Sequence, residues 1–228
     1  MPVQPPDRVT GVAWHTVGTE GARLALADAA HPDPDALCAS AALAAFAPSA
    51  GDLYPGVRAA APPGYREWLE AFLADAMGLP EPRVLAHGFA VASADPAQLA
   101  PVQRIPHFDT SDAQVMALVH YLSPDTHGGT RFYRHRASGF ERITPERAGQ
   151  WRNLLREDAA CHGMPPQHYI GDDTASFTAI GEAPWLFNRI AFYPASLLHA
   201  GQIGESWRVS DPARRRLTIT ALVRIALV

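Results

Sequence analysis

The order of periodic segments along this 228-residue chain most constrains its fold. Apolar residues recur at helical spacing in residues 35–46 and 64–77, and again in residues 145–161. Segments rich in Val, Ile, Phe, Tyr and Thr, bounded by Gly, Pro, Asp or Ser, dominate the later two-thirds of the chain. These strand-like segments are residues 83–91, 115–123, 130–135, 176–180, 185–193 and 216–225. Helices first and strands later predict an α+β domain.

Length and composition favour a single domain. A hydrophobic content of 47% is enough to build one core in a chain of this size. The 21 prolines and 17 glycines are spread along the chain and mark no linker. We therefore expect one domain over residues 1–228, with a mainly helical part at 1–82 and a strand-rich core at 83–228. A helical insertion is expected at 145–162.

Charge and terminal composition exclude several classes of protein. A net charge of −4 gives no electrostatic footprint for nucleic acid. The Ala-rich segment 36–47 is too short to span a bilayer, so we expect no membrane association. Residues 1–7 lack the basic start and apolar stretch of a secretion signal, and Cys38 and Cys161 suit reduced thiols. We expect a cytoplasmic protein, and its oligomeric state stays open.

His107 and Asp109 are predicted metal ligands because they stand two residues apart. In extended backbone both side chains leave the same face, with Cα atoms roughly 6–7 Å apart, so one ion can bind both. His199 is the best candidate for a third ligand, because it follows the apolar run 190–193 and precedes Ala-Gly, where a strand would stop. Two imidazoles and one carboxylate leave open metal positions, as in non-haem Fe(II) oxygenases.

Three consecutive arginines open a segment that alternates like a strand. Counting by two puts Arg216 and Thr218 on one face. A guanidinium stays charged and binds both oxygens of a carboxylate. We therefore expect Arg216 and the Thr218 hydroxyl to receive the far carboxylate of a metal-chelating diacid. Arg214 and Arg215 are expected to form a solvated basic turn.

The order His107-x-Asp109, His199 and Arg216-x-Thr218 resembles that of the iron(II)/2-oxoglutarate-dependent dioxygenase superfamily. Segment 128–132, Gly-Gly-Thr-Arg-Phe, is similar to the Gly-Gly-x-Thr-x-Phe segment of its prolyl-4-hydroxylase-like branch, with the spacing shortened by one. The resemblance covers residues 83–228. Segment 54–58, Tyr-Pro-Gly-Val-Arg, resembles a bacterial family of this superfamily whose members mostly lack an assigned function.

The resemblance implies a double-stranded β-helix, a jelly-roll or cupin-like core with flanking helices. It implies Fe(II) on the three metal ligands named above, with 2-oxoglutarate as cosubstrate and O2 as oxidant. Arg216 and Thr218, helped by Tyr121, would hold the distal carboxylate of 2-oxoglutarate. The expected reaction is hydroxylation of an unactivated C–H bond with release of succinate and CO2, although desaturation or ring closure uses the same ligands.

Two other classes of function remain open. A cupin-like metal enzyme, either an isomerase or a dioxygenase without cosubstrate, would keep the fold and the metal ligands while Arg216 contacts something else. A non-catalytic jelly-roll binding domain would keep only the fold. Pocket walls come from loops, whose pairing the sequence does not specify. We expect the substrate to be a small molecule, an amino acid or a short peptide.

Overall fold

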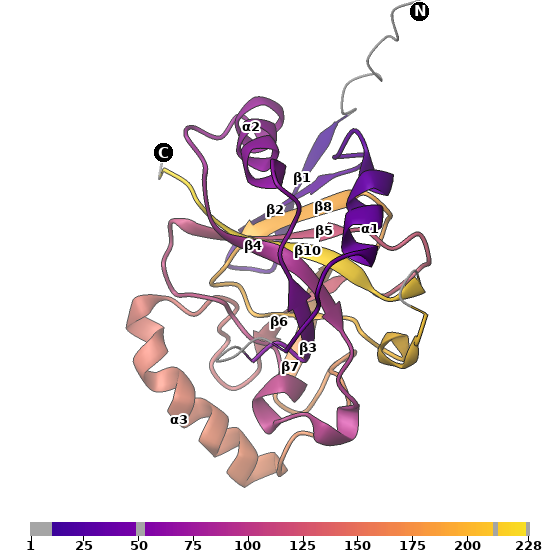
Figure 1. Cartoon of the computed structure of the whole chain (residues 1–228). Coiled ribbons are helices and arrows are strands. Elements are labelled where there is room, and N and C mark those ends of the chain that lie inside the picture. The colour runs from indigo at the N-terminus through magenta and orange to yellow at the C-terminus, as the bar shows by residue number, and fades with distance from the viewer. Residues whose placement is uncertain (1–10, 49–52, 212–213, 227–228) are drawn as a thin grey trace, which may run out of the picture.

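The structure is a computed structural model, and it describes residues 11–48, 53–211 and 214–226. Within these residues the chain forms two antiparallel sheets and three α-helices (Figure 1). The N-terminal residues 1–7, on which the expectation about secretion depends, lie outside the described part. No helix of the described residues combines the length and apolar character needed to cross a membrane.

The larger sheet has seven strands, and every neighbouring pair is antiparallel. In spatial order these are β1 (Val12–Val17), β2 (Ala22–Ala27), β8 (Arg189–Pro194), β5 (Val115–Tyr121), β10 (Leu217–Arg224), β4 (Arg83–Ala92) and β3 (Gly56–Ala59). Side chains alternate between its two faces. In β10, Leu217 and Ile219 join one hydrophobic core, whereas Thr218 and Thr220 face the opposite side and line a cavity.

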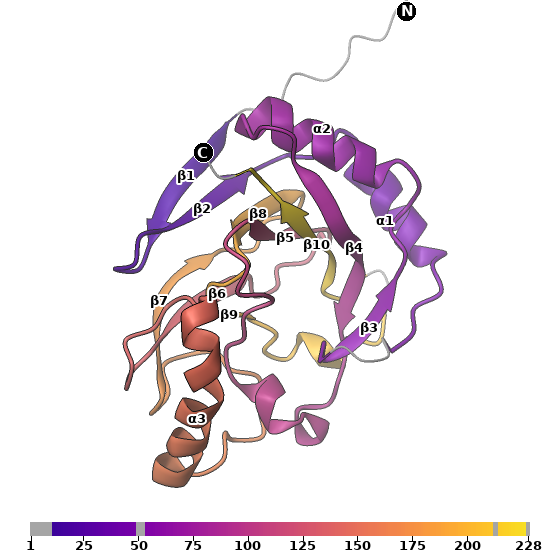
Figure 2. The ribbon, with the colours of Figure 1, turned by 90° about the vertical axis from the view of Figure 1, so that its left-hand side faces the viewer.

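Two helices cover the outer face of the larger sheet (Figure 2). They are α1 (Pro34–Ala42) and α2 (Tyr65–Met77). The apolar face of α2 places Leu69 and Leu73 in the core with no exposed surface. The helix ends at Gly78, whose φ of 66° is a left-handed conformation that glycine adopts readily.

The smaller sheet lies below the inner face of the larger one (Figure 2). Its strands, in spatial order, are β7 (Phe177–Ala183), β6 (Thr130–His135) and β9 (His199–Gly201). A second hydrophobic core, which includes Tyr121, Phe132 and Tyr193, joins the two sheets. The third helix, α3 (Pro145–His162), packs Trp151 against the smaller sheet. The chain is therefore layered as helices, large sheet, small sheet and helix.

The predicted α+β class is confirmed, with some errors in the elements. Strands β1, β2 and β3 were not predicted, so residues 1–82 are less helical than expected, and the short strand β9 was not predicted either. The predicted strand at 185–193 begins only at Arg189, because Asn188 has a left-handed φ of 60°. The predicted helix at 35–46 ends at Ala42.

Candidate metal centre

A pair of backbone hydrogen bonds brings His107 beside His199. The His107 N–H donates to the His199 carbonyl at 2.9 Å, and the His199 N–H donates to the His107 carbonyl at 2.8 Å. Two residues further on, the Asp109 N–H donates to the Ala195 carbonyl at 2.8 Å. Segments ninety residues apart are thereby held side by side at the edge of the smaller sheet.

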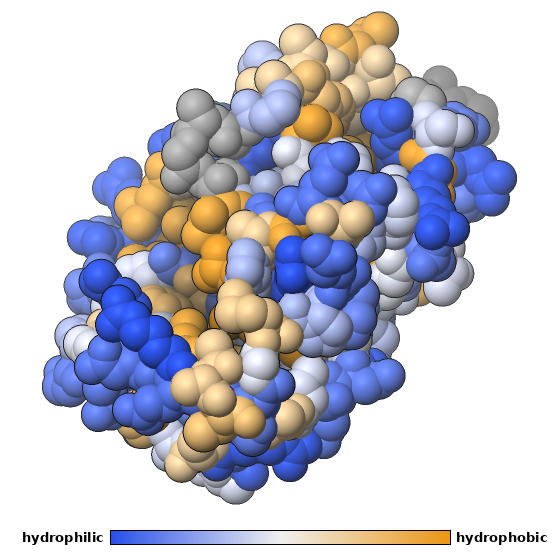
Figure 3. All heavy atoms as spheres, turned by 90° about the horizontal axis from the view of Figure 1, so that it is seen from below, coloured by the Kyte–Doolittle hydropathy of each residue, from blue (hydrophilic) through white to orange (hydrophobic). Residues whose placement is uncertain are grey.

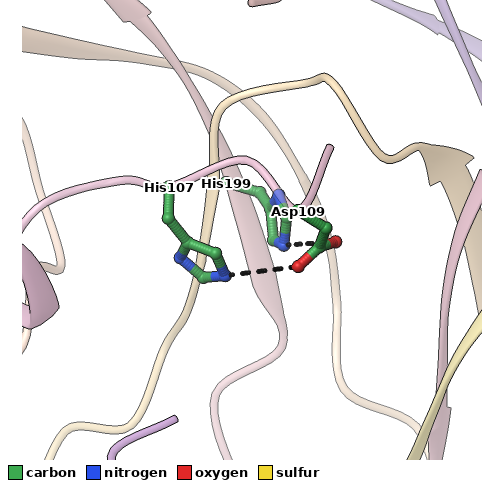
Figure 4. A group of neighbouring side chains, drawn as sticks. All are labelled: His107, Asp109 and His199. Carbon is green, nitrogen blue, oxygen red and sulfur yellow. Dashed lines mark ion pairs between the residues drawn. The ribbon is translucent and has the colours of Figure 1, made fainter. Parts of the chain in front are cut away.

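The three side chains converge (Figure 4). Asp109 Oδ1 lies 4.0 Å from His107 Nε2, and Asp109 Oδ2 lies 3.7 Å from His199 Nε2. One ligand atom from each residue lies within 4.8 Å of the other two. The predicted trio is therefore a group that could hold a metal ion.

His199 is oriented by its own backbone neighbourhood. Its Nδ1 lies 2.8 Å from the Leu197 carbonyl oxygen, which can only accept, so Nδ1 carries the proton. The other ring nitrogen, Nε2, then presents a lone pair toward Asp109. A carbonyl partner of this kind fixes the tautomer and ring orientation of metal-binding histidines in general.

The His107 ring is kept neutral. Its side chain is 52% exposed and lines the open cavity between the two sheets, and the surrounding atoms lower its pKa to about 4. Burial is the largest cause, His199 and Arg58 also lower this pKa, and Asp109 opposes them. A neutral imidazole is the form that binds metal.

The donor set fits a divalent transition metal. Such ions hold nitrogen and oxygen ligands at about 2.0–2.2 Å, which places neighbouring ligand atoms about 3 Å apart. The carboxylate oxygens of Asp109 lie 3.7 Å from His199 Nε2 and 4.0 Å from His107 Nε2, and small side-chain rotations would bring them to that spacing. Two neutral imidazoles and one carboxylate on one side leave positions open for other ligands.

The metal group opens into a cavity of about 830 Å³ between the two sheets. Arg216, Thr218 and Thr220 also line this cavity. Arg216 is 4% exposed, and its guanidinium donates to the Gly128 carbonyl at 3.0 Å and the Gly129 carbonyl at 2.9 Å. No carboxylate in the described part of the chain pairs with Arg216.

The surroundings of Arg216 favour the binding of an anion to its guanidinium. Burial lowers the pKa of Arg216, and nearby tyrosines, with Tyr54 the foremost, partly offset this. A buried cation without a carboxylate counter-charge is unfavourable until an anion pairs with it. Two of its neighbours must be glycine, because a Cβ at Gly128 would overlap Gln202 and a Cβ at Gly129 would overlap the Ala183 carbonyl oxygen.

Of the two residues expected to assist Arg216, Thr218 lines the cavity and Tyr121 does not. Thr218 lines the cavity, and its hydroxyl donates to the Ala90 carbonyl at 3.2 Å. Tyr121 is fully buried, and its hydroxyl donates to Thr130 Oγ1 at 2.9 Å. Among the described residues, Thr130 lines the cavity and Tyr121 does not. The direct contact expected of Tyr121 is therefore not available in this structure, because the Thr130 hydroxyl lies between Tyr121 and the cavity.

The flanking arginines lie outside the cavity. Arg214 pairs with Asp125 at 2.8 Å, and Arg215 donates to the carbonyls of Val209 and Ser210. Only Arg216 of the three lines the cavity, in agreement with the strand register read from the sequence.

Other cavity residues were not singled out as site residues from the sequence, among them Tyr54, Arg58, Tyr169 and Tyr193. Tyr193 stands two residues after Ala191 on the inner face of β8, so strand alternation was a usable signal for it. Tyr54 and Arg58 belong to the segment 54–58 that carried part of the family resemblance. Tyr169 comes from a loop, where no sequence pattern indicated its direction.

The two sheets, the covering helices and the His-Asp-His group define an α+β protein with a candidate metal centre. The chain belongs to the family of unknown function DUF6445, which matches residues 9–223. None of the curated proteins matches it. Among solved structures it is similar to the crystal structure of AviO1 from Streptomyces viridochromogenes Tue57, at 14% identity and a TM-score of 0.46, over 88% of this chain and 89% of that one. The activity therefore has to be inferred from the site itself.

Proposed function

We propose that this chain is an Fe(II)/2-oxoglutarate-dependent oxygenase with a double-stranded β-helix core. Its reaction would be hydroxylation of an unactivated C–H bond in a small molecule, amino acid or short peptide, with release of succinate and CO2. The proposal extends the resemblance found in the sequence.

One observation carries the proposal. A two-histidine, one-carboxylate group and a buried arginine without a carboxylate partner among the described residues line the same cavity. The first suits a divalent iron with open positions, and the second suits a carboxylate. A ligand with a chelating end and a distal carboxylate satisfies both, and 2-oxoglutarate is such a ligand.

Each residue then has a defined task. His107 and His199 act as neutral ligands, and Asp109 adds one negative charge, so a divalent ion keeps a net positive charge that attracts a carboxylate. Leu197 fixes the His199 ring through its carbonyl. Arg216 binds the distal carboxylate while Gly128 and Gly129 hold its guanidinium in place. Iron with 2-oxoglutarate and O2 would supply the oxidising power for the C–H bond.

The buried Arg216 also favours the oxygenase over the two alternative functions. A cosubstrate-independent cupin-like enzyme needs the metal group but has no evident use for Arg216. A non-catalytic binding domain has no evident use for a convergent donor set. Both alternatives stay distinguishable by experiment.

The test is an assay for succinate formed from 2-oxoglutarate by the purified protein, with Fe(II) and ascorbate in air. Even without substrate, we expect slow succinate formation that requires Fe(II) and is lost in Asp109→Ala. The exposed Asp75→Ala on α2 serves as the control variant. Oxygen consumption that does not need 2-oxoglutarate would instead support the cupin-like alternative. A protein that binds no Fe(II) would contradict both enzymatic readings.

A further inference from the structure

The cavity between the two sheets has room for a second molecule beside the proposed cosubstrate. Its volume of about 830 Å³ lies within the range of about 300–1,000 Å³ that is usual for sites holding drug-sized ligands. A short diacid such as 2-oxoglutarate fills only part of this volume. The side chains around the remaining part indicate what kind of molecule it can hold.

One row of side chains crosses the inner face of the larger sheet. Tyr193 on β8 pairs with Ala117 on β5. Leu222 on β10 pairs with Ala117 on one side and with Ala86 of β4 on the other. All four residues line the cavity. Neighbouring strands lie about 4.8 Å apart, so this row from Tyr193 to Ala86 is about 14 Å long.

The two ends of the row have different surroundings. Ala86 is exposed, so the end of the row on β4 is open to solvent. Tyr193 is 1% exposed, and its ring centroid lies 4.9 Å from that of His199. The buried end of the row therefore lies against the candidate metal group. A molecule that lies along the row has one end beside this group and the other end at the opening.

Apolar side chains extend beside the row and out to the cavity rim. Val119 and Gly88, which flank Thr220 in the next row of the sheet, line the cavity. Leu53 and Val102 also line it and are 64% and 39% exposed. On the face that carries α3, apolar side chains gather in a band between hydrophilic ones (Figure 3). The part of the cavity above the row therefore suits hydrocarbon.

The Tyr193 hydroxyl is the polar group of the row. Within the described part of the chain it has no hydrogen-bond partner, whereas the hydroxyls of the buried Tyr65, Tyr121 and Tyr133 are all hydrogen-bonded. A buried hydroxyl without a partner is unfavourable, and such groups in folded proteins usually bind another group or water. The hydroxyl can therefore bind an oxygen atom of a ligand that lies on the row.

The cavity offers little charge to a substrate. Among the described residues that line it, Asp109 is the only carboxylate, and it belongs to the metal group. The proposed function assigns Arg216 to the cosubstrate. Arg58 already donates to Thr220 Oγ1 at 2.8 Å and lies over the Tyr54 ring. A charged substrate would therefore lose its hydration without gaining a dedicated counter-charge, which disfavours a free amino acid.

We propose that the substrate is an uncharged, mainly hydrocarbon molecule, with one oxygen atom hydrogen-bonded to the Tyr193 hydroxyl and its hydrocarbon part along the row toward Ala86. The inference rests on the proposed function, because it takes the cavity to hold a substrate beside the cosubstrate. It places the end of the molecule that carries the oxygen atom beside the metal group. Binding of such a molecule can be measured without turnover.

The experiment measures, by isothermal titration calorimetry on the metal-free protein, the binding of the primary alcohols hexanol, heptanol and octanol. We expect affinity to rise with chain length, by up to about fourfold per added CH2, because each added group is buried on apolar surface. Octylammonium has the same chain with a charged end, and it should bind at least about tenfold more weakly than octanol.

A tyrosine variant tests the hydrogen bond. Tyr193→Phe keeps the ring and removes the hydroxyl, so octanol should bind about three- to tenfold more weakly while the dependence on chain length persists. Tyr133→Phe is the matched control, because Tyr133 is equally buried, donates to the Gly171 carbonyl at 3.0 Å and does not line the cavity. It should bind octanol like the unmodified protein.

An alanine variant tests the position of the hydrocarbon. Ala86→Asp puts a charge at the open end of the row and should weaken the binding of octanol, because apolar contact is lost there. Ala13→Asp is the control, since Ala13 is an exposed alanine on β1 that does not line the cavity. It should leave octanol binding unchanged.

Four results would overturn the inference: no dependence on chain length, octylammonium binding as tightly as octanol, unchanged octanol binding in Tyr193→Phe, or unchanged octanol binding in Ala86→Asp. Failure of the proposed function looks different. In that case the alcohols would bind as described while Fe(II)-dependent succinate formation is absent.

Discussion

At the level of single residues, the candidate metal group depends on one backbone pairing. His107 and His199 exchange two hydrogen bonds, and this pairing sets their rings 4.3 Å apart. Asp109 is fixed separately through its N–H to the Ala195 carbonyl. Because backbone holds all three positions, side-chain substitutions should remove ligands without displacing the remaining ones.

Removal of His199 should abolish tight metal binding. The His199→Ala variant loses one of three ligands, and two ligands of the same group bind a divalent ion far more weakly. Equilibrium dialysis against Fe(II) under anaerobic conditions measures this. His162→Ala, at the exposed end of α3, should bind like the unmodified protein. Wild-type metal affinity in His199→Ala would mean that the third ligand lies elsewhere.

Arg216 should control affinity for 2-oxoglutarate. Loss of one partner of a buried charged pair commonly costs about 2–5 kcal/mol, so Arg216→Ala should weaken binding by roughly 30-fold to several thousand-fold. Calorimetric titration of the protein loaded with Zn(II) in place of Fe(II) gives this value without turnover. Arg214→Ala is the control, since Arg214 pairs with Asp125 at the surface. A larger effect at Arg214 would contradict the assignment.

Among the secondary-structure elements, α2 matters because it covers the outer face of the sheet that carries the cavity on its inner face. Leu69 and Leu73 are fully buried at this contact. The helix contributes no residue to the candidate metal group. Its role in the site is to stabilise the sheet.

Truncation of α2 at its core contact should lower stability. Leu69→Ala removes buried methyl groups and leaves a cavity, at a cost of about 2–5 kcal/mol in the free energy of unfolding. Leu43→Ala, at a position that is 91% exposed, should change this free energy by less than about 0.5 kcal/mol. Urea denaturation of both variants tests the difference. Equal effects would mean that α2 is not packed on the sheet as described.

Elements with a strong local period were predictable, whereas those defined by distant partners were not. The helical spacing of apolar residues in α2 and the alternation of side chains in β10 are local sequence patterns, so both elements were predicted from the sequence. β9 has only three residues, and its identity as a strand comes from pairing with β6. β1 was missed because its sequence Val-Ala-Trp-His-Thr-Val lacks a clear alternation of apolar and polar residues, and β2 was missed because it consists of Ala, Leu and one Arg, which do not favour strands.

The residues of the candidate site also divide into those with a local sequence signal and those placed by distant pairing. Local spacing identified His107 and Asp109, and strand register identified Arg216. The cavity walls from Arg58 and Tyr169 depend on which strands and loops become neighbours in space. That information lies in long-range pairing, which a single sequence does not reveal.

Across the whole molecule, a buried histidine links the helical layer to the large sheet. His120 is fully buried; its Nε2 donates to Asn188 Oδ1 at 2.9 Å, and its Nδ1 accepts from the Tyr65 hydroxyl at 3.0 Å. Asn188 in turn bonds to the backbone of His31. Neutral imidazole satisfies every partner in this network, and protonation would not.

Stability should therefore fall in mild acid. Burial is the largest cause that lowers the pKa of His120 to about 4, whereas an unfolded histidine has a pKa of about 6.5. At a pH between these two pKa values, His120 is protonated in the unfolded chain but neutral in the folded chain. The contribution of neutral His120 to the free energy of unfolding is complete above pH about 6.5. It is lost as the pH falls toward 4, by up to about 3 kcal/mol.

His107 acts in the same direction, so a variant is needed to isolate His120. Chemical denaturation from pH 7 to pH 4.5 should show a shallower loss of stability in His120→Gln than in the unmodified protein. The exposed His15→Gln serves as the control and should leave the slope unchanged. An unchanged slope in His120→Gln would contradict a neutral buried imidazole.

The most direct test of the central claim is an anaerobic titration of the Fe(II)-loaded protein with 2-oxoglutarate, followed by visible absorption. Chelation of iron by the 2-oxo acid produces a charge-transfer band. We expect a stoichiometric band that is lost in Asp109→Ala and needs much more 2-oxoglutarate in Arg216→Ala. An iron-loaded protein whose spectrum stays unchanged at saturating 2-oxoglutarate would contradict the claim that the metal group and the buried arginine form one site.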